Sequence, residues 1–185
     1  MYVIKYILEG GMESTNFSRR IDETCYDADS LPTYPARVLA VHVAQKGVQA
    51  GALGGLLMVP VISYLRKLPL RTAWTRVMVP APFIGTAISL SMLFAMDCYK
   101  PMGLEGVDDR AFRIMNNAGQ VKVDKYSTVA MAAGAAIGAV TIGGISAILA
   151  GASTGVAAGV GVYSAEKAGW VEKLKEFKLP EINKE

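Results

Sequence analysis

The polar side chains most capable of chemistry lie at the start of the first apolar segment. His42, Gln45, Lys46 and Gln49 fall within about two helical turns, and Lys46 is the one charge inside an apolar block. His42 is the only histidine, and an imidazole can carry protons or ligate metals at neutral pH. No cysteine or carboxylate lies near it in sequence. The cluster therefore favours a membrane boundary, where Lys46 reaches lipid headgroups or a neighbouring subunit.

The two cysteines, Cys25 and Cys98, allow a single disulfide. In an oxidising compartment this bond would tie the N-terminal arm to the end of the second apolar span. The alternative is two free thiols, which the long spacing between them favours. A metal site is not expected, because there is no second cysteine pair and no second histidine.

Asp108, Asp109 and Arg110 resemble an acid–base group, but they lie in a connector rich in both signs of charge, where charges normally face water. The chain has no phosphate-binding glycine loop, no serine-nucleophile motif and no zinc-protease motif. The sequence therefore predicts no enzyme, no cofactor and no small-molecule substrate.

Composition places these residues in a membrane protein. The chain of 185 residues is 52% hydrophobic and 19% charged, below the roughly 25% charge of soluble domains. From Tyr126 to Ala165 there is no charged residue, and half of this stretch is glycine and alanine. It is too long for one span, so we expect two short helices packed against each other. A net charge of +3, dispersed along the chain, gives no reason to expect nucleic acid as a partner.

The predicted fold is an all-α membrane protein with four short glycine- and alanine-rich transmembrane helices. A polar arm (1–36) precedes a membrane domain (37–166), which contains a hydrophilic connector (97–125), and an amphipathic C-terminal tail (167–185) follows. The spans are expected at about 38–65, 77–96, 127–149 and 151–165, with a turn at Ala150 to Thr154 between the last two.

Four spans place both termini on the same side of the membrane. The loop between the first two spans carries four bases and no acid: Arg66, Lys67, Arg71 and Arg76. The positive-inside rule places this loop in the cytoplasm or the mitochondrial matrix, and the termini in the opposite compartment. These four bases are also the candidates for binding lipid headgroups.

Glycines recur every fourth residue in three of the four spans, so that each span presents one face without side chains. The second span lacks this pattern, and its larger apolar side chains predict a surface for lipid or partners. The helix-packing glycines are Gly47, Gly51 and Gly55 in the first span, Gly134 and Gly138 in the third, and Gly151, Gly155 and Gly159 in the fourth.

Four glycine-rich spans, a basic first loop and termini on one side resemble the mitochondrial inner-membrane translocase family, which includes an accessory subunit of respiratory complex I. The segment from Ala133 to Gly138 matches the end of the family motif, a small residue followed by Gly-x-x-x-Gly. Lys122 and Tyr126 stand where the motif has Arg and Asp, and this departure is closer to the complex I relative. The tail adds to the likeness, with Trp170 in a charged end.

The resemblance implies a non-catalytic accessory subunit of complex I in the mitochondrial inner membrane, with its termini in the intermembrane space. Its partners would be membrane lipids, cardiolipin among them, and other subunits of the membrane arm, with a contact to complex III in a supercomplex. Two alternatives stay open: a subunit of an inner-membrane protein or metabolite translocase, and a structural subunit of another respiratory complex.

Overall fold

The structure is a computed structural model that describes residues 34–100, 103–141 and 143–170. Within these residues the chain is helical and contains no strand, as the sequence predicts. The predicted polar arm up to residue 33, with Cys25, and the tail from residue 171 lie outside the described residues. The helices are α2 (Pro35–Arg66), α3 (Leu70–Met78), α4 (Ala81–Tyr99), α5 (Leu104–Asn116), α6 (Ala118–Thr141) and α7 (Ile145–Lys167).

Prolines and one left-handed residue set the ends of α2. Pro35 occupies the first turn, where its missing N–H needs no partner. The helix ends at Lys67, whose φ of 49° is left-handed and whose N–H lies against the carbonyls of Ser63 and Tyr64. Pro69 follows and prevents the helix from continuing.

The basic segment, predicted as a loop over 66–76, is mostly the short helix α3. Its apolar face is buried through Ala73 and Met78, and its cationic face is exposed. Pro80 and Pro82 then start α4, so this helix begins four residues later than the predicted span and continues to Tyr99. The helical period of the apolar residues, rather than the density of charge, determines that α3 forms.

Most of the described part of the hydrophilic connector predicted over 97–125 is also helical. It contains the end of α4, all of α5 and the first two turns of α6. Val107 and Ala111 of α5 are buried, and Val107 packs with Leu39 of α2. One apolar face on an otherwise charged segment is sufficient to fold it against α2.

The turn between the last two long helices lies at Gly143 and Gly144, not at Ala150 to Thr154 as predicted. Both glycines have positive φ, 74° and 82°, which other residues rarely adopt. The N–H of Gly143 donates to the carbonyl oxygen of Gly138, at 3.2 Å, and closes the end of α6. The segment predicted as the turn is instead inside α7, where Gly151 meets α6.

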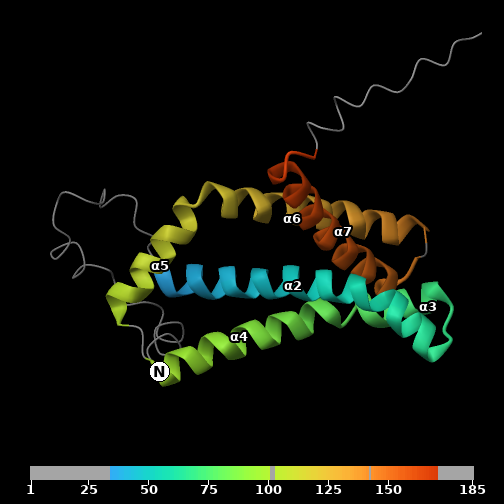
Figure 1. The fold of residues 1–185 in the computed structure, drawn as a ribbon, viewed down its shortest axis with the longest axis horizontal. Coiled ribbons are helices and arrows are strands. Elements are labelled where there is room, and N and C mark those ends of the chain that lie inside the picture. Colours follow the sequence, from blue (N-terminus) through green and yellow to red (C-terminus); the bar gives the residue numbers. More distant parts are fainter. Residues whose placement is uncertain (1–33, 101–102, 142, 171–185) are drawn as a thin grey trace, which may run out of the picture.

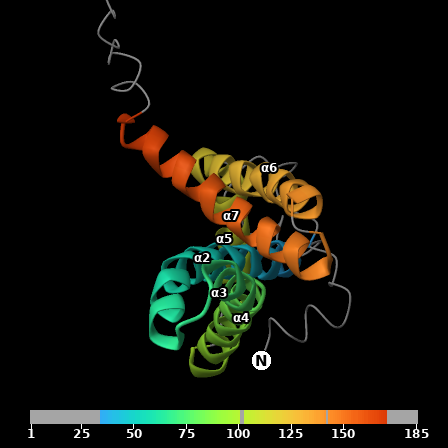
Figure 2. The same cartoon turned by 90° about the vertical axis from the view of Figure 1, so that its right-hand side faces the viewer.

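The long helices form two pairs, α2 with α4 and α6 with α7, and α2 also contacts α7. α4 packs along α2, and α6 crosses against α7 (Figure 1). Viewed from the end, α6 and α7 lie together on one side of α2, and α4 lies on the other (Figure 2). α5 closes one end between α4 and α6, and α3 lies at the other end, near the start of α7 (Figure 1). α2 and α6 run in one direction, and α4 and α7 run in the other.

The core among the described residues is thin, and the outer surface is apolar. Small clusters such as Ala52 with Val156 and Ala157 join α2 to α7. In contrast, only Pro82 and Asp97 of α4 are buried, while Phe83 is 64% exposed. Within the part of the chain that the structure describes, three segments are long and apolar enough to cross a membrane: Pro35–Arg66, Leu70–Tyr99 and Ile145–Lys167. An apolar exterior around small interior residues is the arrangement expected in lipid.

Candidate functional site

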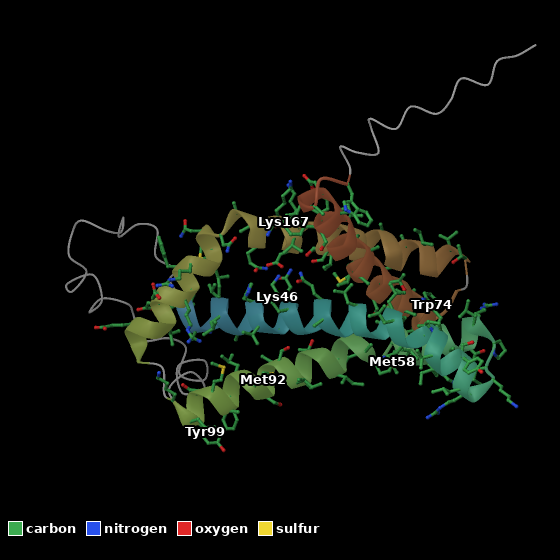
Figure 3. The ribbon with its side chains drawn as sticks, viewed as in Figure 1. Lys46, Met58, Trp74, Met92, Tyr99 and Lys167 are labelled. Atoms are coloured by element: carbon green, nitrogen blue, oxygen red, sulfur yellow. The ribbon has the colours of Figure 1, made fainter. Side chains whose placement is uncertain are left out.

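The charge inside the first apolar segment is paired across the molecule. Lys46 Nζ of α2 donates a hydrogen bond to Asp124 Oδ1 of α6, at 2.6 Å. Figure 3 shows Lys46 on the side of α2 that faces α6. The side chains are 30% and 20% exposed, so water screens this ion pair only in part. An unpaired charge at this position would be unfavourable, so the pair specifies which faces of α2 and α6 meet.

Gln49 and Ser127 complete the hydrogen bonding of this pair. Gln49 Nε2 donates to Asp124 Oδ1 and to Ser127 Oγ, at 2.8 and 2.9 Å, and Gln49 Oε1 accepts from Lys46 at 2.8 Å. His42 Nδ1 lies 3.8 Å from the other carboxylate oxygen of Asp124. Gln49 and Ser127 are buried, so their polar atoms are satisfied inside the protein. We call His42, Lys46, Gln49, Asp124 and Ser127 the polar cluster.

The sequence predicted the α2 half of the polar cluster and missed the α6 half. Lys46 was expected to reach lipid headgroups or a neighbouring subunit, whereas the structure pairs it with Asp124. The signal in the sequence is weak but specific: Asp124 is the last acid before the uncharged stretch that begins at Tyr126. Gln45, also expected in the cluster, makes no hydrogen bond to it among the described residues.

A second polar contact joins the start of α6 to the end of α7. Glu166 accepts from Lys122 Nζ at 2.5 Å and from the Tyr126 hydroxyl at 2.9 Å. The Tyr126 ring also lies 6.4 Å from that of Tyr163. The hydrogen bond to Glu166 raises the pKa of the Lys122 ammonium. Both motif positions that depart from the translocase pattern, Lys122 and Tyr126, therefore bind the same carboxylate.

The glycines of α6 and α7 lie where the two backbones touch. A Cβ atom added to Gly134 would meet the carbonyl oxygen of Gly151, and one added to Gly151 would meet that of Gly134. Gly138 and Gly155 face Ala147 and Ala130 in the same way, and Gly159 faces Tyr126. No side chain fits at these positions, so the glycines determine how closely the two helices approach.

The glycines of α2 face α4 and the end of α3. A Cβ atom on Gly47 would lie 2.6 Å from Thr86 Cα, and one on Gly51 would meet the carbonyl oxygen of Ala81. At Gly55 it would lie 2.6 Å from the Ala81 Cβ. The sequence missed the partner, Gly85, whose added Cβ would meet the carbonyl oxygen of Gly47. Gly85 is not part of a repeat that would mark it in the sequence, yet it also allows α2 and α4 to approach closely.

The remaining candidates from the sequence do not come together. In α5, Asp109 pairs with Arg113 on the helix surface, while Asp108 is buried, which raises the pKa of its carboxyl. Cys98 is a free and exposed thiol, and its predicted partner lies outside the described residues. Among residues 34–100, 103–141 and 143–170, no group of three potential metal ligands occurs.

The four bases of the first connection gather at the end of the molecule occupied by α3. Each side chain is exposed, and no ion pair within the described part of the chain uses any of them: Arg66, Lys67, Arg71 and Arg76. The helix ends beside them carry no acid, because there is none from Arg37 to Met96 or from Tyr126 to Ala165. This end of the molecule is therefore strongly positive.

These features define the class: an all-helical protein with helices long and apolar enough to cross a membrane, paired through glycine. The chain belongs to the family described as "Protein of unknown function (DUF1757)", whose model matches residues 18–164. The matched residues include α2 to α6 and nearly all of α7. No curated protein and no solved structure shows a significant match to the chain.

Proposed function

We propose that this protein is a non-catalytic, multi-pass subunit of a larger assembly in the mitochondrial inner membrane, and that the assembly is respiratory complex I. Its role is to pack against neighbouring subunits and lipid and so to stabilise the membrane arm. The observation that carries the proposal is the contrast between the two faces of α4. One face is joined to α2 backbone to backbone, and the other is apolar and uncovered.

The uncovered face of α4 suits contact with other membrane subunits. Its large apolar side chains are more than half exposed at Ile84, Ile88 and Met92. No charged side chain interrupts this face between Arg76 and Asp97. A rigid helix pair with one apolar outer face is what a packing subunit requires, since it binds neighbours without needing chemistry of its own.

We infer four membrane passes, with α6 as the third. α6 has no charge from Tyr126 to Thr141, a length of about 24 Å at 1.5 Å per residue, against a hydrocarbon thickness of about 30 Å. A helix this short is accommodated by tilt, by local thinning of the bilayer or by a partner helix. The continuous glycine contact with α7 supplies such a partner.

The orientation follows from charge. With the end of the molecule at α3 carrying four bases and no acid, the positive-inside rule assigns that end to the matrix. Both termini and α5 then face the intermembrane space. The resemblance to the translocase-like accessory subunit favours complex I over other assemblies of this membrane.

The test is blue-native separation of mitochondrial membranes in mild detergent, with the protein followed by mass spectrometry. We expect it to migrate with NADH dehydrogenase activity, and we expect its depletion to lower the amount of assembled complex. The activity of each assembled complex should change little, because no catalytic group is removed. Migration with complex III, complex IV or ATP synthase alone would contradict the assignment to complex I.

A translocase subunit is the second candidate, and one observation favours it. A cavity of about 590 Å³ lies between the α4 side and the α6–α7 side of the molecule. The polar side chains that line it are Thr86 and Ser153, so the cavity would suit an apolar segment in transit rather than a polar metabolite. Migration with the import machinery in the same experiment would support this candidate.

A further inference from the structure

The cavity between the helix pairs is a groove with α2 at its base. α4 forms one wall through residues such as Phe83, Ala87 and Leu90, and Ala152 and Val156 of α7 form much of the other. The two walls remain apart because α4 packs on α2 and α3, while α7 packs on α2, α3 and α6. The volume of about 590 Å³ falls within the roughly 300–1,000 Å³ of ligand pockets.

The occupant of this groove must be apolar. The two lining hydroxyls already donate hydrogen bonds to their own helices: Thr86 to the Pro82 carbonyl at 2.8 Å and Ser153 to the Leu149 carbonyl at 2.9 Å. No charged side chain lines the groove. A polar ligand would lose its hydrogen bonds to water and gain few here, whereas a hydrocarbon chain loses none and gains dispersion contacts.

One end of the groove lies at the positive end of the molecule. Pro82 lines it and begins α4 directly after α3. Ser153 lines the opposite wall, and its neighbour in sequence, Thr154, accepts a hydrogen bond from the indole of Trp74 in α3, at 2.9 Å. Figure 3 shows Trp74 at this same end. The exposed guanidinium groups of Arg71 and Arg76 belong to the same short helix.

We propose that the groove holds an acyl chain of an anionic phospholipid, whose phosphate headgroup is bound by the cations of α3 and the adjoining end of α2. The acyl chain of the lipid is the apolar occupant of the groove. The phosphate is the negative charge that would pair with the exposed bases. The inference rests on the membrane placement in the proposed function and not on the identity of the assembly. Each basic residue near an anionic lipid favours binding about fivefold.

The experiment places the full-length protein in phosphatidylcholine nanodiscs that contain a small share of phosphatidylglycerol with a photoreactive acyl chain. A parallel sample contains phosphatidylcholine with the same photoreactive chain. We expect peptides with Leu90 and Ala152 to be labelled several-fold more by the phosphatidylglycerol probe. Equal labelling by the two probes, or no more labelling there than on the outer face of α6, would overturn the proposal.

Two sets of variants test the two parts of the site. Ala87→Phe fills the groove from an exposed position on α4, and it should abolish the labelling of Ala152 peptides; Ala95→Phe, exposed on the same helix and outside the groove, should not. Arg71→Gln combined with Arg76→Gln should remove most of the several-fold preference for phosphatidylglycerol, so that the two probes label these peptides nearly equally. Lys125→Gln, an exposed base in α6, should leave the preference unchanged. A preference that survives the double arginine variant would overturn the headgroup assignment.

A transmembrane helix of a partner is the competing occupant. A photoreactive amino acid at Leu90, activated in intact mitochondrial membranes, should form a lipid adduct. A protein adduct at this position would overturn the proposal. Failure of the complex I assignment is distinguished from failure of this proposal, because the nanodisc labelling is measured on the isolated protein and does not depend on co-migration.

Discussion

Lys46 and Asp124 show how a helix long and apolar enough to cross a membrane accommodates a charge in its first half. Neither side chain is more than 30% exposed, and Gln49 binds both. Desolvation of the two charges opposes much of their attraction, so the pair contributes mainly by specifying which helices meet. Removal of one partner destabilises the protein, because it leaves the other charge partly buried and unpaired.

Lys46→Met should therefore destabilise the protein, by about 1–3 kcal/mol for a half-buried pair. Asp124→Asn should also destabilise it. The double variant should lose less than the sum of the single losses, by about 1 kcal/mol or more, since the second change removes a charge that the first left unpaired. Thermal unfolding in detergent micelles measures these differences.

The exposed ion pair of α5 is the matched control. Arg113 and Asp109 lie four residues apart on the helix surface, and such pairs contribute about 0.3–0.5 kcal/mol. Asp109→Asn should lower the melting temperature only slightly. A loss as large as that of Lys46→Met, or additive losses in the double variant, would contradict a specific role for the polar cluster.

Asp108 should make stability depend on pH. Burial disfavours its carboxylate, so its pKa is higher in the folded chain than the ordinary value of about 3.9. The stability that the protonated Asp108 contributes is fully present below the pKa of this group in the unfolded chain. It is lost as pH rises through the higher pKa of the folded chain. Asp108→Asn should thus melt above the wild type at neutral pH and show a flatter profile from acidic to neutral pH. A lower melting temperature for this variant at neutral pH would show that the charge is favoured.

At the scale of the helices, pairing depends on which glycines meet a backbone. Gly155 lies against the carbonyl oxygen of Ala130, whereas an added Cβ on Gly161 of the same helix has no neighbour within 4 Å. The two glycines have the same helix propensity and differ only in their surroundings. Comparing substitutions at the two glycines therefore distinguishes the low helix propensity of glycine from the stabilisation that it gives to a close helix contact.

Gly155→Ala should destabilise the protein by about 1–3 kcal/mol, because the methyl group forces the helices apart. Gly161→Ala should be neutral or stabilising, by up to about 1 kcal/mol, since alanine favours the helix. Thermal unfolding of both variants in the same detergent tests the difference. If Gly155→Ala were as stable as Gly161→Ala, close approach of α6 and α7 would not determine stability.

The sequence predicted the elements well where one local signal dominates. Apolar length indicated α2, and it indicated a second long helix whose start, α4 at Ala81, lies four residues after the predicted one. It failed where two local signals competed, as at the turn before α7. Glycine at Gly151 is compatible with a turn or with a helix contact, and only the packing of α6 against α7 decides between them.

For the whole molecule, the direction of each helix can be tested in the membrane. The four passes that we propose would put the end of α4 and the start of α3 on opposite sides. Cys98 is exposed at the first of these positions, and Leu70, 63% exposed, lies at the second. A thiol reagent that cannot cross the membrane distinguishes them in mitochondria stripped of the outer membrane.

With Cys25 replaced by serine, Cys98 should react with this reagent without permeabilisation, because the proposed orientation places it in the intermembrane space. Leu70→Cys with Cys98→Ser should react only after the inner membrane is permeabilised. The mass added to each peptide measures the extent of reaction. The reverse pattern would invert the orientation, and reaction of both without permeabilisation would exclude an odd number of crossings between them.

Local sequence by itself determined the membrane class, the helical fold and the glycine faces, because apolar length, helical period and backbone freedom act over a few residues. Tertiary structure decided which faces meet. Lys46 and Asp124 are 78 residues apart, and Gly85 shows no repeat until α2 lies against it. The groove likewise exists only because α4 and α7 pack on different sides of α2. Contacts between distant segments depend on how whole helices approach, which no short window of sequence contains.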